Sequence, residues 1–357
     1  MVKCFFKYLI FFLFIPVFMT LTLDYFYGYF FEKKNPEKEY RVFHPIYHHT
    51  LKPNFNSNSA KYLDITYKIC TDSRGFRFDC KSKELKKYDV AFIGDSFTEG
   101  VQVSYENSFV GLIDKATDLN VVNLGVSSYS PVIYYHKVKN LLEKTNLNFE
   151  HLIVFIDISD ISNETMWKNC GGYVCEELLL GSTPFLVKLK TKLADSFPLH
   201  YKFYYKIKTI FSERPTYFVT PGLTVLDYNY ELSAWTYNSK VGGYGKGGVE
   251  KGIQTALINM EKLYHILVKN NIKLSIAVYP WPGQIMHDVV NSKQVNIWFN
   301  FCKGKCFKFI NYFPYFFNYA EKFGKKETIE QFYLKNDFHF NEKGNEMIAN
   351  KFILNFN

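Results

Sequence analysis

A serine stands in a short glycine-containing turn where a predicted strand meets a predicted helix. Phe92–Gly100 reads FIGDSFTEG and begins within the apolar run 90–93. A hydroxyl at Ser96 would project from the carboxyl end of the strand, where peptide N–H groups entering the helix could stabilise negative charge on an oxygen. Gly94 would let the backbone approach a ligand closely. A plain helix cap is the simpler alternative, because Asp95 and Ser96 are both favoured N-cap residues. The turn makes Ser96 a candidate nucleophile.

A histidine with a nearby carboxylate lies close to the other end of the chain. Asp337 and His339 precede residues 346–356, whose apolar positions recur at helical spacing. A nucleophilic serine needs a base that is neutral near pH 7, and a carboxylate on the other ring nitrogen would orient that base. His287 and Asp288 are alternative candidates. His339 is preferred for its place before the final helix.

These blocks resemble the SGNH hydrolase family, also called GDSL-like esterases. The matching pieces are Gly94-Asp95-Ser96, Asn123-Leu124-Gly125, and Asp337 with His339. The resemblance implies a flavodoxin-like three-layer α/β/α sandwich with a central parallel sheet.

The resemblance also assigns roles within the expected site. Ser96 would be the nucleophile, His339 the base and Asp337 its orienting group, with the backbone N–H groups of Ser96 and Gly125 in the oxyanion hole. The family usually has Gly-x-Asn-Asp in its third block, whereas this chain has Asp157-Ile158-Ser159-Asp160. Ser159 therefore stands where an asparagine would donate to the oxyanion, and Asn163 is a nearby substitute.

The spacing of the last block leaves the reaction open between two kinds of acyl transfer. Asp337-x-His339 is shorter than the commoner Asp-x-x-His and is similar to the branch containing alginate O-acetyltransferases. The first expectation is a serine esterase acting on an acylated glycan or lipid. The alternatives are an O-acyltransferase that acetylates a cell-surface polysaccharide, and a non-catalytic glycan-binding protein.

The first 32 residues contain the longest apolar run. Lys3 and Lys7 precede 16 uncharged residues, Tyr8–Leu23, and aromatic residues continue to Phe31. A helix over 8–31 would be about 36 Å long, enough to cross a bilayer. A cleaved signal peptide is the alternative, but such a segment ends in small residues. We predict a transmembrane signal anchor, with the rest of the chain extracytoplasmic, in the periplasm or at the cell surface.

The cysteines fall into close pairs apart from Cys4. The pairs are Cys70 with Cys80, Cys170 with Cys175, and Cys302 with Cys306. This spacing predicts three local disulfides in an oxidising compartment. Structural zinc is the alternative, but no pair has the Cys-x-x-Cys spacing of a zinc knuckle. We expect no metal and no cofactor.

Composition favours one large globular domain. The 357 residues are 47% hydrophobic and 19% aromatic, enough to bury a full core. The formal charge of +9 comes mostly from scattered lysines. It fits attraction to anionic lipid or acidic polysaccharide better than nucleic-acid binding, which we do not expect.

From residue 86 onward, strand and helix patterns alternate, which predicts a parallel sheet with crossover helices. The expected strands are 90–93, 121–125, 152–156, 274–279 and 307–312. The expected helices lie near 106–117, 132–144, 249–269 and 346–356. Ser96, Gly125 and Ser159 each follow a strand's carboxyl end, where ligands bind in open α/β sheets.

The chain divides into the anchor at 1–32, a β-rich extension at 33–85, and the catalytic domain at 86–357. An aromatic-rich insertion at about 163–248 would shape the substrate cleft. Its Trp235, Tyr237 and Tyr244 could stack on sugar rings or simply pack, and its glycine cluster at 242–248 suggests a flap. Arg74 or Arg77 in the extension could reach the active site, but a structural ion pair is the expected role.

Overall fold

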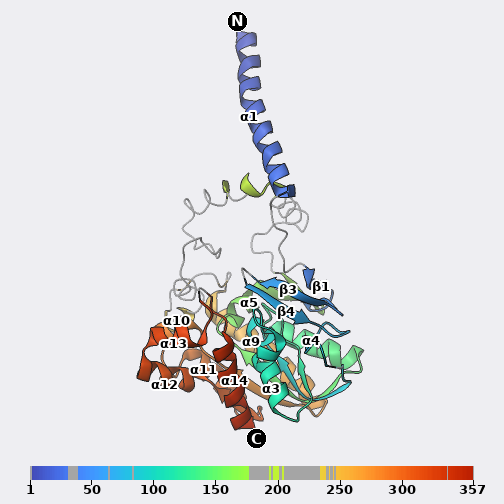
Figure 1. Cartoon of the computed structure of the whole chain (residues 1–357), viewed down its shortest axis with the longest axis vertical. Coiled ribbons are helices and arrows are strands. Elements are labelled where there is room, and N and C mark those ends of the chain that lie inside the picture. Colours follow the sequence, from blue (N-terminus) through green and yellow to red (C-terminus); the bar gives the residue numbers. More distant parts are fainter. Residues whose placement is uncertain are drawn as a thin grey trace. The chain divides into compact units, whose positions relative to one another are not determined.

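The computed structural model describes most of the chain as two compact units (Figure 1). One unit comprises residues 1–35 with 178–218, and the other comprises 36–177 with 219–357. The described residues are 2–30, 39–62, 65–82, 84–176, 193, 196–200, 203–204, 234–238, 241, 244, 247–335 and 337–356.

The smaller unit contains helix α1, Val2–Phe30, with Pro16 inside it. The buried carboxylate of Asp24 accepts hydrogen bonds from the N–H groups of Leu199, at 2.9 Å, and His200, at 2.8 Å. The predicted transmembrane segment is not supported, because no helix among the described residues is long and apolar enough to cross a membrane.

The larger unit is built on a five-stranded parallel sheet, which confirms the predicted α/β class. Its strands are β5 (Lys87–Ile93), β6 (Val121–Asn123), β7 (Asn148–Ile156), β10 (Lys273–Val278) and β11 (Lys308–Asn311). They lie in the order β11-β10-β7-β5-β6, and every neighbouring pair is parallel. The strand order reverses between β5 and β7, as in flavodoxin-like sheets, which bind ligands at this switch point.

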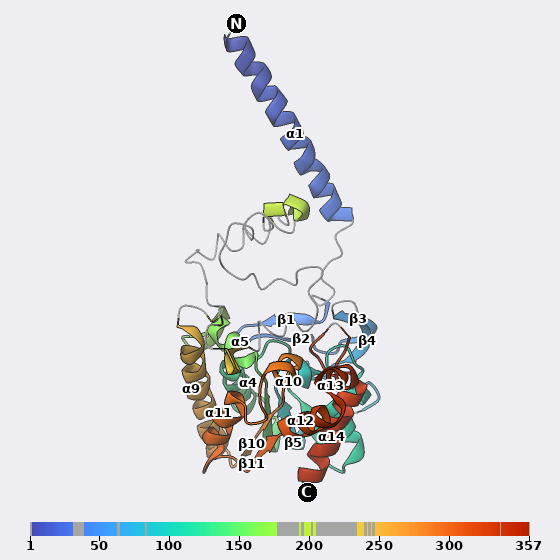
Figure 2. The same cartoon turned by 90° about the vertical axis from the view of Figure 1, so that its left-hand side faces the viewer.

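Helices cover both faces of the sheet (Figure 2). Helices α4 and α9 pack together on one face, and α3 and α14 pack together on the other. The α-helices among the described residues of this unit are α2 (Ser96–Glu99), α3 (Phe109–Ala116), α4 (Pro131–Lys144), α5 (Asp160–Met166), α9 (Gly248–Lys269), α10 (Pro282–His287), α11 (Lys293–Cys302), α12 (Phe313–Phe323), α13 (Lys325–Phe332) and α14 (Glu342–Phe356).

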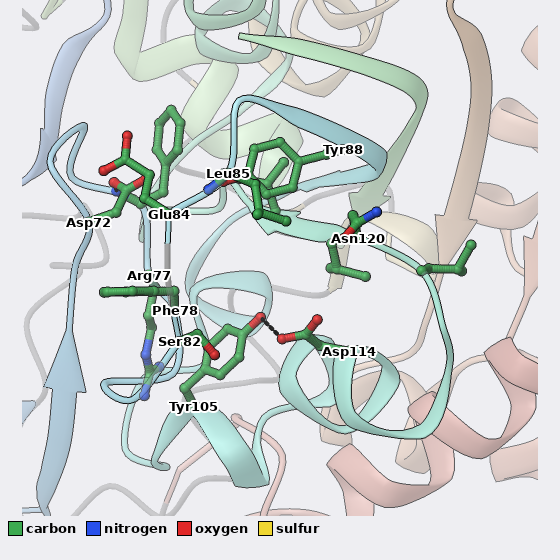
Figure 3. Close-up of a pocket in the computed structure, with 14 residues that line it drawn as sticks. Asp72, Arg77, Phe78, Ser82, Glu84, Leu85, Tyr88, Tyr105, Asp114 and Asn120 are labelled. Atoms are coloured by element: carbon green, nitrogen blue, oxygen red, sulfur yellow. Dashed lines mark hydrogen bonds between the residues drawn. The ribbon is translucent and has the colours of Figure 1, made fainter.

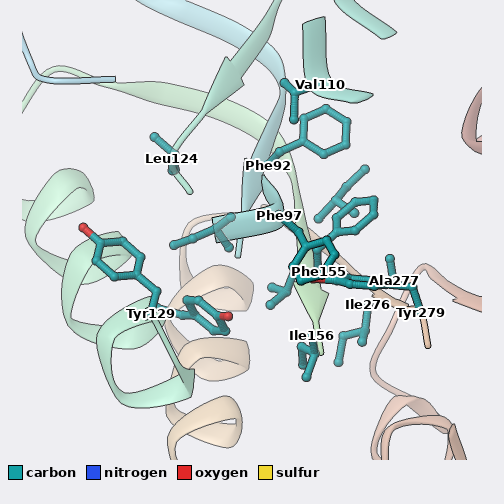
Figure 4. Close-up of a cluster of buried hydrophobic side chains, with 14 of the residues drawn as sticks. Phe92, Phe97, Val110, Leu124, Tyr129, Phe155, Ile156, Ile276, Ala277 and Tyr279 are labelled. Atoms are coloured by element: carbon teal, nitrogen blue, oxygen red, sulfur yellow. The ribbon is translucent and has the colours of Figure 1, made fainter. Parts of the chain in front are cut away.

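The core around the sheet is rich in aromatic side chains (Figure 4). Phe92 on β5 and Phe155 on β7 are buried, with ring centroids 6.0 Å apart. Phe109 stacks on Phe155 at 4.5 Å, so α3 is held against the centre of the sheet. This packing fixes the strand ends from which the candidate site is built.

Residues from the β-rich extension form two antiparallel hairpins. The first joins β1 (Arg41–His44) to β2 (His48–Leu51), and the second joins β3 (Asn56–Tyr62) to β4 (Ile65–Cys70). A third hairpin, β8 (Trp167–Cys170) with β9 (Tyr173–Glu176), lies at the start of the predicted insertion. Most of the rest of that insertion, including much of the predicted flap, falls outside the described residues.

The six paired cysteines are all disulfide-bonded, which confirms the predicted pairing. The bonds join Cys70 to Cys80, Cys170 to Cys175, and Cys302 to Cys306.

Candidate active site

The serine turn leads from β5 directly into the short helix α2, which begins at Ser96. The Asp95 carboxylate caps this helix by accepting a hydrogen bond from the N–H of Phe97 at 3.0 Å. Gly94 has no room for a side chain, because a Cβ there would clash with Thr98 and with the carbonyl oxygen of Phe155. The tight turn therefore requires glycine at this position and presents the serine at the end of the strand.

The histidine is held by a folded loop between α13 and α14. Tyr333 and Phe340 form an antiparallel bridge across this loop. The N–H of Leu334 donates to the carbonyl of His339 at 2.9 Å. Phe97 also packs against the imidazole, with ring centroids 4.9 Å apart. The loop thus brings a residue from near the C-terminus onto the turn after β5.

Ser96, His339 and Asp337 form a continuous chain of hydrogen bonds. Ser96 Oγ lies 2.7 Å from His339 Nε2, and His339 Nδ1 lies 2.6 Å from Asp337 Oδ1. Exposure of these residues is only 5%, 2% and 5%, respectively. The structure therefore brings together the three residues predicted from the sequence.

The charge on Asp337 determines the direction of these hydrogen bonds. Burial by itself would raise the pKa of Asp337, but His339 and the hydrogen bonds from His339 and Gln102 lower it to about 2. An ionised carboxylate can only accept, so Nδ1 of His339 must carry a proton. In the neutral ring, Nε2 then accepts from the hydroxyl of Ser96. This is the arrangement a general base requires.

The predicted oxyanion donors differ in how they are engaged. Ser96 is the first residue of α2, so its N–H has no partner within the helix. The Gly125 N–H donates to Asn123 Oδ1 at 2.9 Å. The hydroxyl of Ser159 donates to Asp157 Oδ1 at 2.7 Å, and the Ser159 N–H donates to the same oxygen, also at 2.7 Å. The predicted donors at Gly125 and Ser159 are thus already hydrogen-bonded to neighbouring side chains.

Three buried carboxyl groups lie in or near the serine turn, namely Asp95, Asp157 and Asp160. Burial and the nearby Asp157 raise the pKa of Asp95 well above its usual value. Burial, together with Asp157 and Asp95, likewise raises the pKa of Asp160. Trp281 Nε1 donates to Asp157 Oδ2 at 2.8 Å. The raised pKa values favour the neutral forms of Asp95 and Asp160, which would limit the negative charge beside the candidate nucleophile.

The other residues singled out in the sequence lie elsewhere. Asp288 accepts a hydrogen bond from the hydroxyl of Ser292 at 2.7 Å. The histidine that is hydrogen-bonded to Ser96 is His339, not the alternative His287. Trp235 and Tyr244 are buried, as the packing alternative requires. Arg74 pairs with Asp72 at 2.8 Å and Glu84 at 3.2 Å. Arg77, in contrast, donates to backbone carbonyls, including that of Glu99 at 2.6 Å.

The structure adds two residues, Gln102 and Glu99, that were not predicted as part of the site. Gln102 Nε2 donates to Asp337 Oδ2 at 2.7 Å. Glu99 is fully buried, pairs with Arg41 at 2.9 Å and accepts from the N–H of Ser127 at 2.8 Å. Glu99 belongs to the serine turn itself, so its position three residues after the candidate nucleophile is the one available signal.

A cavity of about 260 Å³ lies apart from this site (Figure 3). Its walls include Arg77, Tyr105 and Asp114, and the Tyr105 hydroxyl donates to Asp114 at 3.2 Å. None of Ser96, Asp337 and His339 lines it. Within the described part of the chain, no three His, Cys, Asp or Glu side chains are grouped as metal ligands.

Among known proteins, similarity to this chain is found with solved structures. No protein-family model matches the chain, and no curated protein matches it significantly. An acetyl xylan esterase is 16% identical, with a TM-score of 0.41, covering 74% of this chain and 98% of its own. A putative lipolytic protein of the G-D-S-L family from Desulfitobacterium hafniense is 14% identical, with a TM-score of 0.37, covering 75% and 97%. A psychrotrophic esterase from Pseudoalteromonas is 10% identical, with a TM-score of 0.35, covering 76% and 97%.

Identities and TM-scores this low add nothing to the geometry of the site, on which the functional assignment has to rest. The solved structures to which this chain is similar include esterases and lipolytic proteins of the G-D-S-L family.

Proposed function

We propose that this protein is a serine ester hydrolase of the SGNH type, with Ser96 as nucleophile, His339 as general base and Asp337 as its orienting carboxylate. The observation that carries the proposal is the pair of contacts at 2.7 Å and 2.6 Å that join the three side chains. Their position at the switch point of a flavodoxin-like sheet supports it.

The reaction follows from the hydrogen-bond directions. His339 Nε2 takes the hydroxyl proton as Ser96 Oγ forms a bond to the ester carbonyl carbon. The resulting imidazolium is stabilised by Asp337 and returns the proton to the leaving alcohol when the ester C–O bond breaks. Water, activated by the same histidine, then hydrolyses the acyl-enzyme.

The negative charge that develops on the carbonyl oxygen needs hydrogen-bond donors. The N–H of Ser96 supplies one donor at the start of α2. The N–H of Gly125 supplies a second if it exchanges the Asn123 amide oxygen for the oxyanion. Ser159 keeps its hydroxyl on Asp157, so the proposal assigns it no direct part.

The proposed substrate is an acylated glycan or lipid, and the proposed location is an extracytoplasmic compartment. The three disulfides support an oxidising compartment. If a sugar hydroxyl instead of water takes the acyl group, the same acyl-enzyme gives an O-acyltransferase. Incubation with acyl donor and candidate sugars distinguishes the two, because transfer yields an acylated acceptor by mass spectrometry and hydrolysis yields only free acid.

The nucleophile is tested by turnover of p-nitrophenyl acetate. Ser96→Ala should lower kcat by about 10³-fold or more, because no other group can form the acyl-enzyme. Ser104→Ala is a matched control, since that residue precedes a short helix without a side-chain capping bond. A fluorophosphonate probe should label Ser96 in the parent protein, its oxygen displacing fluoride from phosphorus. Equal turnover by the parent and Ser96→Ala, with no labelled Ser96 peptide, would exclude the mechanism.

A further inference from the structure

We propose that Gln102 is a positioning residue for Asp337, and that Arg77 holds the loop carrying it. This inference rests on the proposed function, since it concerns the carboxylate that orients the general base. The relevant feature is a second hydrogen-bond donor on Asp337, supplied by a side chain three residues beyond the end of α2. The loop that carries it lies outside the three matching blocks.

The Asp337 carboxylate is held on both oxygens. Oδ1 accepts from His339 Nδ1 at 2.6 Å and from the His339 N–H at 3.0 Å. Oδ2 accepts from Gln102 Nε2 at 2.7 Å, and no other hydrogen bond to Oδ2 is found among the described residues. Gln102 is only 6% exposed, so water has little access to replace it. Rotation of the carboxylate away from the imidazole would break the Gln102 contact.

The backbone at Gln102 is in a conformation that favours glycine. Its φ is +66°, in the left-handed region where a side chain is disfavoured. Gly100, two residues earlier, has a φ of +75° and is the C-cap of α2. A glutamine at such a position is unfavourable for the loop alone, which indicates that its side-chain contact contributes to the folded site.

Arg77 holds the loop on both sides of Gln102. Its guanidinium is fully buried and donates to the carbonyl of Glu99 at 2.6 Å, and also to the carbonyls of Gly100 and Val103. These acceptors flank Gln102 in the sequence, so Arg77 restricts the loop where the side chain must reach Asp337. This use of Arg77 replaces the side-chain ion pair expected from the sequence.

Three variants of Gln102 separate positioning from general stability. Gln102→Gly suits the backbone and removes the donor. Gln102→Leu keeps side-chain volume without the donor. Gln102→Glu keeps the shape but places a second carboxyl group beside Asp337, which can donate only when protonated. Each is compared with the parent for kcat and KM on p-nitrophenyl acetate, for labelling of Ser96 by the fluorophosphonate, and for melting temperature.

We expect Gln102→Gly and Gln102→Leu to lower kcat about tenfold or more with KM within twofold of the parent. The labelling rate should fall in parallel. Gln102→Glu should be the slowest at pH 8, and its activity relative to the parent should recover as the pH falls toward 5, because the introduced carboxyl group then donates to Asp337. A residue that only filled space would show no such pH-dependent recovery.

The experiments distinguish a failure of the positioning role of Gln102 from a failure of the proposed function. If the parent turns over and labels at Ser96 while all three variants keep the parental kcat and pH profile, the positioning role is overturned and the proposed function stands. If Ser96 of the parent neither labels nor supports turnover, the proposed function fails, and the inference about Gln102 fails with it.

Discussion

Ser159 stands where an oxyanion donor was expected, but its hydroxyl is hydrogen-bonded to Asp157. Both its N–H and its hydroxyl donate to Asp157 Oδ1, and Trp281 donates to the other oxygen of that carboxylate. The carboxylate is buried, so loss of one donor leaves part of its hydrogen-bonding capacity unsatisfied. The local geometry therefore gives the hydroxyl a structural role.

Ser159→Ala should leave kcat for p-nitrophenyl acetate within about threefold of the parent, whereas loss of a working oxyanion donor costs about 10²–10³-fold. Stability should fall by about 1 kcal/mol, measured by urea unfolding, because Asp157 loses one hydrogen bond. Ser162→Ala is the control, since its hydroxyl donates only to the nearby carbonyl of Ser159. A hundredfold loss of kcat in a stably folded variant would show that the hydroxyl turns to the oxyanion during the reaction.

Among single residues, the sequence could predict those with the most specific chemistry. Ser96, Asp337 and His339 were identified because their types and local settings point to one reaction, and the structure places them in contact. The contact of Gln102 with Asp337 joins residues 235 positions apart. No local pattern encodes it, because Gln102 stands between Val101 and Val103 in a segment without a recognisable motif.

Helix α4 carries a buried lysine that contacts the loop containing Gly125. Lys137 is fully buried, and its ammonium donates to the carbonyl of Leu124 at 2.9 Å and to the hydroxyl of Tyr129 at 3.2 Å. Burial lowers the pKa of Lys137 to about 7, against smaller opposing effects of Asp72 and Glu99. The folded protein therefore releases this proton at a much lower pH than the unfolded chain, whose lysines titrate near pH 10.4.

The free energy of unfolding should rise with pH because of Lys137. Between about pH 7 and pH 10 the unfolded chain binds one more proton than the folded protein at this residue, so stability increases by up to about 1.4 kcal/mol per pH unit. Below pH 7 both states hold the proton and the contribution is constant.

Urea unfolding of the parent and of Lys137→Met at pH 7, 8 and 9 tests this effect. The parent should gain roughly 2 kcal/mol relative to the variant between pH 7 and pH 9. The difference between the two proteins removes the contribution of other titrating groups. Parallel curves over this range would show that the folded protein keeps the lysine proton.

The elements themselves were predictable where hydrophobic periodicity was strong. The predicted strand 90–93 corresponds to β5, and the predicted helix 249–269 corresponds to α9 almost residue for residue. Helix α12 was not predicted. Its run FPYFFNYAEKF is aromatic, and aromatic residues have modest helix propensity, so packing against the core stabilises it rather than local preference.

The disulfides close short loops along the chain, and one of these loops reaches the candidate site. The Cys70–Cys80 bond closes a ten-residue loop that contains Arg77, the residue that holds the backbone beside Gln102. The Cys302–Cys306 bond closes a loop of only four residues after α11. Their spacing was evident in the sequence, whereas the connection of the first loop to the active site depends on three-dimensional contacts.

The two bonds should differ in their contribution to stability. In the chain-entropy description, a ten-residue loop contributes roughly 2.7 kcal/mol and a four-residue loop roughly 1.9 kcal/mol. The double variant Cys70→Ala with Cys80→Ala should therefore lose more stability in urea than Cys302→Ala with Cys306→Ala. It should also lose kcat for p-nitrophenyl acetate at temperatures below its melting point, because greater freedom of the loop containing Arg77 loosens the support of Gln102. The Cys302–Cys306 variant, whose loop has no such contact, should keep the parental kcat while it remains folded. If both variants kept full activity, the Cys70–Cys80 loop would contribute to stability but not to the geometry at Asp337.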